Sequence, residues 1–141
     1  MPFTTGAVDS ATRMMPKLIP GRAHLLVDCA AIASFFLAGI RYWRRNKPAA
    51  MAACLCGTAA AANTLLTSYP RGNSGIYHLP MHGKIEYGIA AMSAVMPELM
   101  SFQNEPEKAF FVTQGALMIA AANLTNFGRK RKDLRRSSRT A

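Results

Sequence analysis

The sequence predicts an all-α membrane protein with four transmembrane helices, built as a tandem duplication of a two-helix hairpin. Two observations carry this prediction. Four apolar segments, each 16 to 21 residues long, are separated by stretches rich in charged residues, glycine and proline. The two halves of the chain also align without a gap when one is shifted by 58 positions. The four segments are residues 24–40, 49–66, 82–102 and 109–124.

Each segment is close to the length of about 20 residues that an α-helix needs to cross a bilayer. Lys84 is the only Lys or Arg within the four segments. The alternative is a soluble four-helix bundle, whose helices should each carry a charged face. The second and fourth segments have no such face, which favours the membrane. The soluble alternative stays open because the segments are rich in alanine and because Asp28, Glu86 and Glu98 lie within or near them.

The N-terminal lead-in, residues 1–21, has no early apolar region and carries Asp9, so it is not a cleavable signal peptide. It is either flexible or a short amphipathic helix on the membrane surface.

Farther along the chain, Pro97 should kink the third helix or end it early. Small residues that let helices approach closely are Gly57, Ala61, Gly115 and Ala120. The three cysteines, interpreted as small packing residues, are Cys29, Cys54 and Cys56.

The shift of 58 positions divides the chain into repeat unit 1 (residues 22–68), a middle loop (69–81) and repeat unit 2 (82–127). Because each unit contains two spans, both units should have the same orientation. This arrangement predicts a pseudo-two-fold axis along the membrane normal. The aligned pairs include His24 with His82, Asp28 with Glu86, Asn46 with Asn104, Pro48 with Pro106, Gly57 with Gly115, Leu66 with Leu124 and Thr67 with Thr125.

Basic residues predict the orientation. The side that holds both termini carries 12 of the 17 Lys and Arg residues, so both termini should be cytoplasmic, although the basic loop after the first segment opposes this orientation. The tail, residues 128–141, should bind anionic lipid headgroups at about 1 kcal/mol per base. Nucleic acid is the less favoured partner, because the tail has no aromatic residues for stacking. The basic residues of the tail are Arg129, Lys130, Arg131, Lys132, Arg135, Arg136 and Arg139.

Polar residues should gather in one layer near the cytoplasmic face. His24 and Asp28, like His82 and Glu86, are four residues apart and therefore neighbours on one helix face. The ends of the second and fourth helices return to the same side. The candidate layer consists of His24, Asp28, Asn63, His82, Glu86 and Asn123, with Thr67 and Thr125 beside them.

Several interpretations of this layer stay open. In the first, the acids favour helix N-termini and bond to their own histidines, and the protein is a non-enzymatic scaffold or subunit of a membrane assembly. Asp28 and Glu86 could instead serve a small proton- or ion-linked transporter. A third alternative is a redox protein in which His24 and His82 hold haem b. No catalytic residue, metal ligand or resident cofactor is predicted, and self-association or binding to other membrane proteins is left open.

One stretch resembles a known family. LPMHGKIEYGIAAMSAVMPELMSF is similar to the half-unit of the SPW-repeat type of small bacterial four-helix membrane proteins. Pro80, His82, Glu86, Pro97 and Phe102 stand at the positions of the family pattern, while the Ser-Pro-Trp tripeptide itself is absent. The resemblance implies a duplicated membrane hairpin in the bacterial inner membrane and no particular biochemical activity.

Overall fold

A computed structural model of the chain describes residues 16–69 and 75–127 and confirms the all-α prediction. The helices begin one to three residues before the apolar segments expected from the sequence. The third helix ends two residues after Pro97, and the next turn is closed by the left-handed residue Ser101, with φ of 59°. The helices are α2 (Gly21–Tyr42), α3 (Lys47–Leu65), α4 (Leu79–Leu99) and α5 (Lys108–Leu124).

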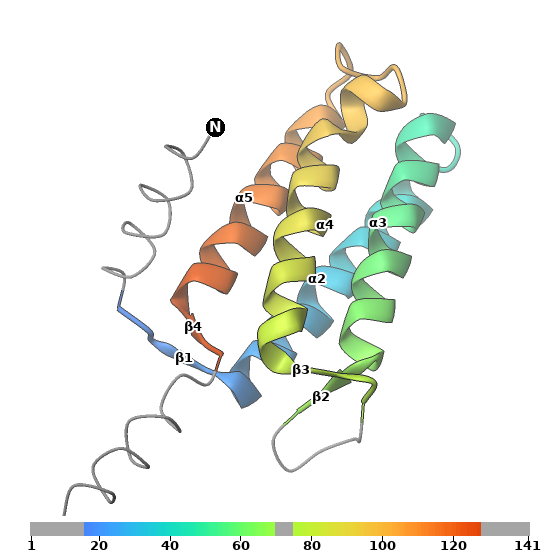
Figure 1. Ribbon diagram of the computed structural model, residues 1–141. Coiled ribbons are helices and arrows are strands. Elements are labelled where there is room, and N and C mark those ends of the chain that lie inside the picture. The colour runs from blue at the N-terminus through green and yellow to red at the C-terminus, as the bar shows by residue number, and fades with distance from the viewer. Residues whose placement is uncertain (1–15, 70–74, 128–141) are drawn as a thin grey trace, which may run out of the picture.

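The four helices pack as a bundle (Figure 1). α2 packs mainly on α3, and α4 mainly on α5. These two hairpins meet where α3 contacts α4 and α2 contacts α5. The starts of α2 and α4 and the ends of α3 and α5 therefore lie at one end of the bundle, and the two tight connections lie at the other (Figure 1).

Two pairs of very short parallel strands join the hairpins at the first of these ends. β1 (Ile19–Pro20) precedes α2 and pairs with β4 (Thr125–Asn126), which follows α5. β2 (Thr67–Ser68) follows α3 and pairs with β3 (Tyr77–His78), which precedes α4. β3 lies 58 positions after β1, and β4 lies 58 positions after β2. Each strand pair thus links the first half of the chain to the second.

The connections at the other end differ from each other. Asn46 caps α3, and its side chain accepts a hydrogen bond from the backbone N–H of Ala49 at 3.0 Å. α5 begins three residues after the position that corresponds, at the offset of 58, to the start of α3. It directly follows the buried Glu107. The amide of Asn46 donates to the Glu107 carboxylate at 3.4 Å, so the two connections are tied together.

Glycines allow close helix contact in both hairpins. A Cβ atom on Gly57 of α3 would lie 3.0 Å from the Cβ of Phe35 on α2. A Cβ on Gly115 of α5 would lie 2.6 Å from the carbonyl oxygen of Ala90 on α4. The interior is otherwise rich in small side chains, and buried alanines come from all four helices: Ala38, Ala49, Ala50, Ala52, Ala53, Ala60, Ala90, Ala121 and Ala122.

Large apolar side chains point outward instead. They come from all four helices and include Leu26, Leu37, Ile40, Met51, Leu55, Val95, Leu99, Leu117 and Ile119. By length and composition α2 and α3 can each cross a membrane, while α5 is apolar but shorter. α4, which carries Lys84, Glu86 and Glu98, is not among the candidate spans. These two spans support a membrane location. The basic tail and residues 1–15 lie outside the described residues.

The contact at Gly115 yields a stability prediction. Replacing Gly115 with Ala should destabilise the protein by roughly 1–3 kcal/mol, because the added methyl group must push a backbone carbonyl of α4 away. Thermal unfolding of the purified protein in detergent measures this change. Gly88→Ala is the matched control, since a Cβ there has no heavy atom within 4 Å. Equal stability of the two variants would contradict the proposed close packing.

Candidate functional site

Four buried ionisable side chains converge between α2 and α4. His24 and Asp28 come from α2, and His82 and Glu86 come from α4. Each is at most 7% exposed. One ligand-type atom from each residue can be chosen so that all four atoms lie within 4.8 Å of one another. These residues, the His–acid quartet, join two helices that belong to different hairpins.

The histidines alternate with the carboxylates inside the quartet. Nε2 of His24 lies 3.3 Å from Asp28 and 3.0 Å from Glu86. Nε2 of His82 lies 3.2 Å from Asp28 and 3.9 Å from Glu86. Each carboxylate therefore faces the imidazole of its own helix and that of the other helix. The spacing of four residues along each helix brings the pairs together, but the cross-helix contacts depend on the bundle.

One threonine contacts the far side of each imidazole. The hydroxyl of Thr125 donates to the carbonyl oxygen of Ala121 at 2.7 Å, so its oxygen is left to accept from Nδ1–H of His24, also at 2.7 Å. Thr67 does the same: it donates to the carbonyl of Asn63 at 2.5 Å and contacts Nδ1 of His82 at 2.9 Å. Both Nδ1 atoms must then carry a proton. This leaves both Nε2 atoms facing the carboxylates.

The two carboxylates have different partners. Nε2 of His24 and an oxygen of Glu86 are hydrogen-bonded at 3.0 Å, so one proton lies between them. Asp28 accepts a hydrogen bond from the hydroxyl of Tyr69 at 2.9 Å. Burial raises the pKa of the Tyr69 phenol well above its ordinary value of 10, and the neighbouring Asp28 raises it further. Tyr69 therefore remains protonated and donates to Asp28.

One atom of the quartet is without a hydrogen bond. Among the described residues, Nε2 of His82 is the buried side-chain nitrogen or oxygen without a hydrogen-bond partner, although an oxygen of Asp28 lies 3.2 Å from it. A cavity of about 10 Å³ lies beside it, and Asp28, His82 and Glu86 are among its lining residues. Such a cavity has room for about one water-sized group. A buried nitrogen beside a cavity of this size can contact a single water molecule or ion held there.

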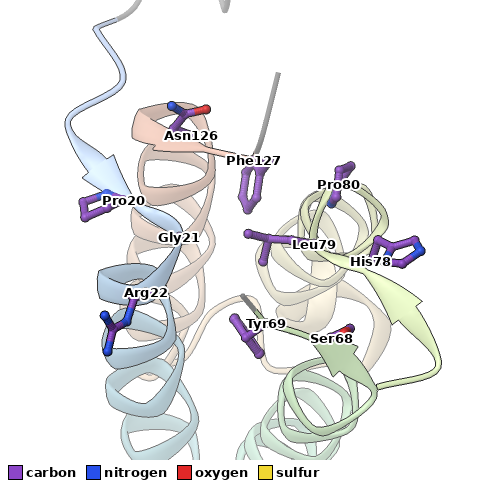
Figure 2. Close-up of a pocket in the computed structure, with 10 residues that line it drawn as sticks. All are labelled: Pro20, Gly21, Arg22, Ser68, Tyr69, His78, Leu79, Pro80, Asn126 and Phe127. Atoms are coloured by element: carbon purple, nitrogen blue, oxygen red, sulfur yellow. The ribbon is translucent and has the colours of Figure 1, made fainter. Parts of the chain in front are cut away.

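Aromatic rings cover the quartet toward the end of the bundle. Phe127 lies edge-on to His24 with the ring centroids 5.1 Å apart, and Tyr69 lies 6.0 Å from His82. Above them is a pocket of about 470 Å³. Figure 2 shows Tyr69, Leu79 and Phe127 toward the middle of this pocket. Its ten lining residues form five pairs that are 58 positions apart: Pro20 and His78, Gly21 and Leu79, Arg22 and Pro80, Ser68 and Asn126, and Tyr69 and Phe127.

The two remaining residues of the expected polar layer do not belong to the quartet, although Asn63 lines the same small cavity. Asn63 is buried and holds the backbone, since it donates to the carbonyl of His82 at 3.3 Å and accepts from Tyr77 at 2.7 Å. Asn123 is only half-buried and accepts a hydrogen bond from Tyr87. His78 is exposed, as expected.

Tyr69 and Phe127 were missed by sequence reasoning. The offset of 58 residues was the available signal, because it relates these two residues as it relates the two histidines.

The arrangement offers little to haem. The two imidazole rings are only 5.4 Å apart and nearly perpendicular, at 87°. The carboxylates of Asp28 and Glu86 fill the space between the Nε2 atoms, where a porphyrin would have to lie. A small cation, which needs no such space, fits the four converging groups. Comparison with known proteins adds no relative, since no family model, curated protein or solved structure matches the chain.

The threonine contacts lead to a second prediction. Thr125→Val should cost about 1–3 kcal/mol of stability, because the buried Nδ1–H of His24 loses its acceptor while the side-chain shape is retained. Thr125→Ser should restore most of this loss. The control is Ser34→Ala, which removes a similar bond to a carbonyl four residues back at an exposed position. Chemical denaturation of the three variants measures the differences. Equal losses in Thr125→Val and Ser34→Ala would contradict the role given to Thr125.

Proposed function

We propose that the protein is a non-enzymatic, four-span integral membrane protein that binds a cation in the His–acid quartet. The observation that carries this proposal is the convergence of four buried ionisable groups, with both Nε2 atoms turned toward two carboxylates. Intramembrane acids are costly, and a partner of opposite charge is what makes them tolerable. A bound cation provides that charge where Nε2 of His82 has no hydrogen bond.

The distribution of side-chain size supports four spans. Small residues lie between the helices, and large apolar residues point outward from all four helices. A soluble protein rarely exposes large apolar side chains so widely on every helix. In a bilayer the same arrangement is expected, because helices associate there through close contact of small residues while leucine and isoleucine face lipid. α4 crosses in this proposal because its acid Glu86 is buried in the bundle.

The recurring offset of 58 positions supports the duplication. It relates β1 to β3, β2 to β4, Thr67 to Thr125 and the five residue pairs that line the pocket. The quartet and the pocket then lie on the pseudo-two-fold axis. The resemblance of the second unit to SPW-repeat proteins agrees with this architecture. In this proposal the protein lies in the bacterial inner membrane, and the basic residues favour cytoplasmic termini, where the basic tail contacts anionic lipid.

Two neighbouring functions remain testable alternatives. A carrier would use Asp28 and Glu86 to move the bound cation or proton across the membrane. A scaffold would use the quartet only to hold α2 and α4 together. The orphaned nitrogen of His82 favours binding over the scaffold, because a purely structural cluster gains nothing from a buried group without a hydrogen bond.

Membrane insertion gives the third prediction. The protein should stay in the membrane pellet after an alkaline wash. A reporter inserted at position 104 and a reporter fused after position 127 should lie on opposite faces of the membrane. A reporter inserted at position 72 should lie on the same face as the C-terminus. Recovery in the supernatant without detergent, or reporters at 104 and the C-terminus on one face, would contradict four spans.

Cation binding gives the fourth prediction. After treatment with a chelator, at least one cation among Na⁺, K⁺, Mg²⁺, Ca²⁺, Mn²⁺, Zn²⁺ and Co²⁺ should raise the unfolding temperature of the protein in detergent. A ligand at 100 times its Kd adds about 2.7 kcal/mol. The double variant Asp28→Asn, Glu86→Gln should lose the increase.

Glu98→Gln is the matched control, because Glu98 is exposed and paired with Lys108 at 3.2 Å, away from the quartet. If no cation stabilises the wild-type protein, the quartet is structural and the scaffold stands.

A further inference from the structure

We infer that the cation is a divalent transition metal of the zinc class, held four-coordinate by the quartet. This inference rests on the proposed cation site and names the ion. The ligand atoms are Nε2 of His24, Nε2 of His82 and one oxygen each of Asp28 and Glu86. Thr67 and Thr125 are positioning residues that hold the imidazoles.

The donor set selects the class of metal. Imidazole nitrogens suit Zn²⁺ and its first-row neighbours, whereas Ca²⁺ takes six to eight oxygen ligands. Mg²⁺ usually retains several water molecules. The quartet provides two nitrogens and two carboxylates around a cavity of about 10 Å³, which leaves no room for a shell of waters. A small ion with four protein ligands fits these limits.

The separations between imidazole and carboxylate atoms are near those of tetrahedral coordination. Zinc binds nitrogen and oxygen at about 2.0–2.2 Å, so the ligand atoms of a tetrahedral site lie roughly 3.3–3.6 Å from one another. The four contacts between imidazole and carboxylate span 3.0 to 3.9 Å. All four ligand atoms lie within 4.8 Å of one another, so the quartet has to contract around the ion to reach the separations of a tetrahedral site.

The tautomers are already those that metal binding needs. A metal-bound histidine normally donates its other N–H to a neighbouring oxygen, which fixes the ring and raises its basicity. Thr125 and Thr67 accept this bond from His24 and His82. Each threonine can only accept here, because its own proton is donated to a helix carbonyl. Tyr69 supports Asp28 from the other direction, by donating a hydrogen bond to its carboxylate.

Charge and protons balance on binding. Two carboxylates and one divalent ion give a neutral site, which suits a buried position in a bilayer. The proton between His24 and Glu86 occupies the place of the metal–ligand bonds, so it must leave when the ion binds. Metal uptake therefore releases at least one proton. The pocket above Tyr69 and Phe127 provides the nearest route from the aqueous phase.

Co²⁺ is the probe that tests this inference. The full-length protein is purified in detergent, stripped with a chelator and titrated with Co²⁺. The wild-type protein should develop the intense visible absorption of four-coordinate Co²⁺, at one equivalent. Zn²⁺ should abolish this absorption, and a large excess of Mg²⁺ or Ca²⁺ should not. Calorimetry in two buffers of different ionisation enthalpy should show proton release.

Variants assign the ligands. His82→Gln should lose the absorption, and His78→Gln should retain it, because His78 is exposed and outside the quartet. Thr67→Val and Thr125→Val should weaken Co²⁺ affinity by about 10- to 100-fold, as is typical for groups behind a metal ligand. Serine at either position should restore affinity. Rescue by serine separates a positioning role from a general loss of stability.

The outcomes distinguish the two proposals. If Co²⁺ gives only the weak spectrum of a six-coordinate ion, or does not bind, while Na⁺, Mg²⁺ or Ca²⁺ stabilises the protein through the quartet, the zinc-class inference is wrong and the cation site stands. If no cation acts through the quartet, both fail. The wild-type spectrum alone decides the first question, so the inference does not depend on the folding of any variant.

Discussion

Burial of the His–acid quartet is the constraint on which the rest of the structure depends. Four ionisable groups are removed from water between α2 and α4, and they are tolerable there only together. Each histidine needs a threonine from the other half of the chain: His24 is held by Thr125, and His82 by Thr67. Neither hairpin alone can therefore supply the hydrogen-bond acceptor that its own histidine needs. The short strand pairs, which also join the two halves, bring these threonines to the required positions.

The bundle separates two kinds of interior along its length. The end with the strand pairs is polar, whereas the interior closer to the tight connections is filled by packed aromatic rings, with Phe102 and Phe111 5.1 Å apart and Phe35 and Phe110 5.7 Å apart. Between them, Gly57 and Gly115 bring the helices of each hairpin into close contact. A rigid, closely packed bundle keeps the quartet fixed, and a fixed set of ligands is what selective binding of a small cation requires.

Much of this architecture was accessible from the sequence. The apolar segments predicted the four helices, and the spacing of four residues predicted that each histidine meets its own acid. The contacts between helices were not predictable, because the spacing of residues along one helix does not determine which other helix that face packs against. Asn123 illustrates the limit: it lies at the expected level, but the rotation of α5 directs it to Tyr87 instead of the quartet. Tyr69 was missed because it follows α3 in a connection, where periodicity gives no information.

The two halves of the site are similar but not equivalent, and the difference has a chemical consequence. Tyr69 occupies the place in the first half that Phe127 occupies in the second, so the hydroxyl that reaches Asp28 has no counterpart at position 127. Asp28 receives that hydroxyl, while Glu86 shares a proton with His24. The orphaned nitrogen is that of His82, whose nearest acid is the one already engaged by Tyr69. A strictly symmetric quartet would pair every group with an equal partner. Here the two halves differ both in Tyr69 against Phe127 and in Asp28 against Glu86, and the nitrogen left without a hydrogen bond, Nε2 of His82, lies beside the small cavity.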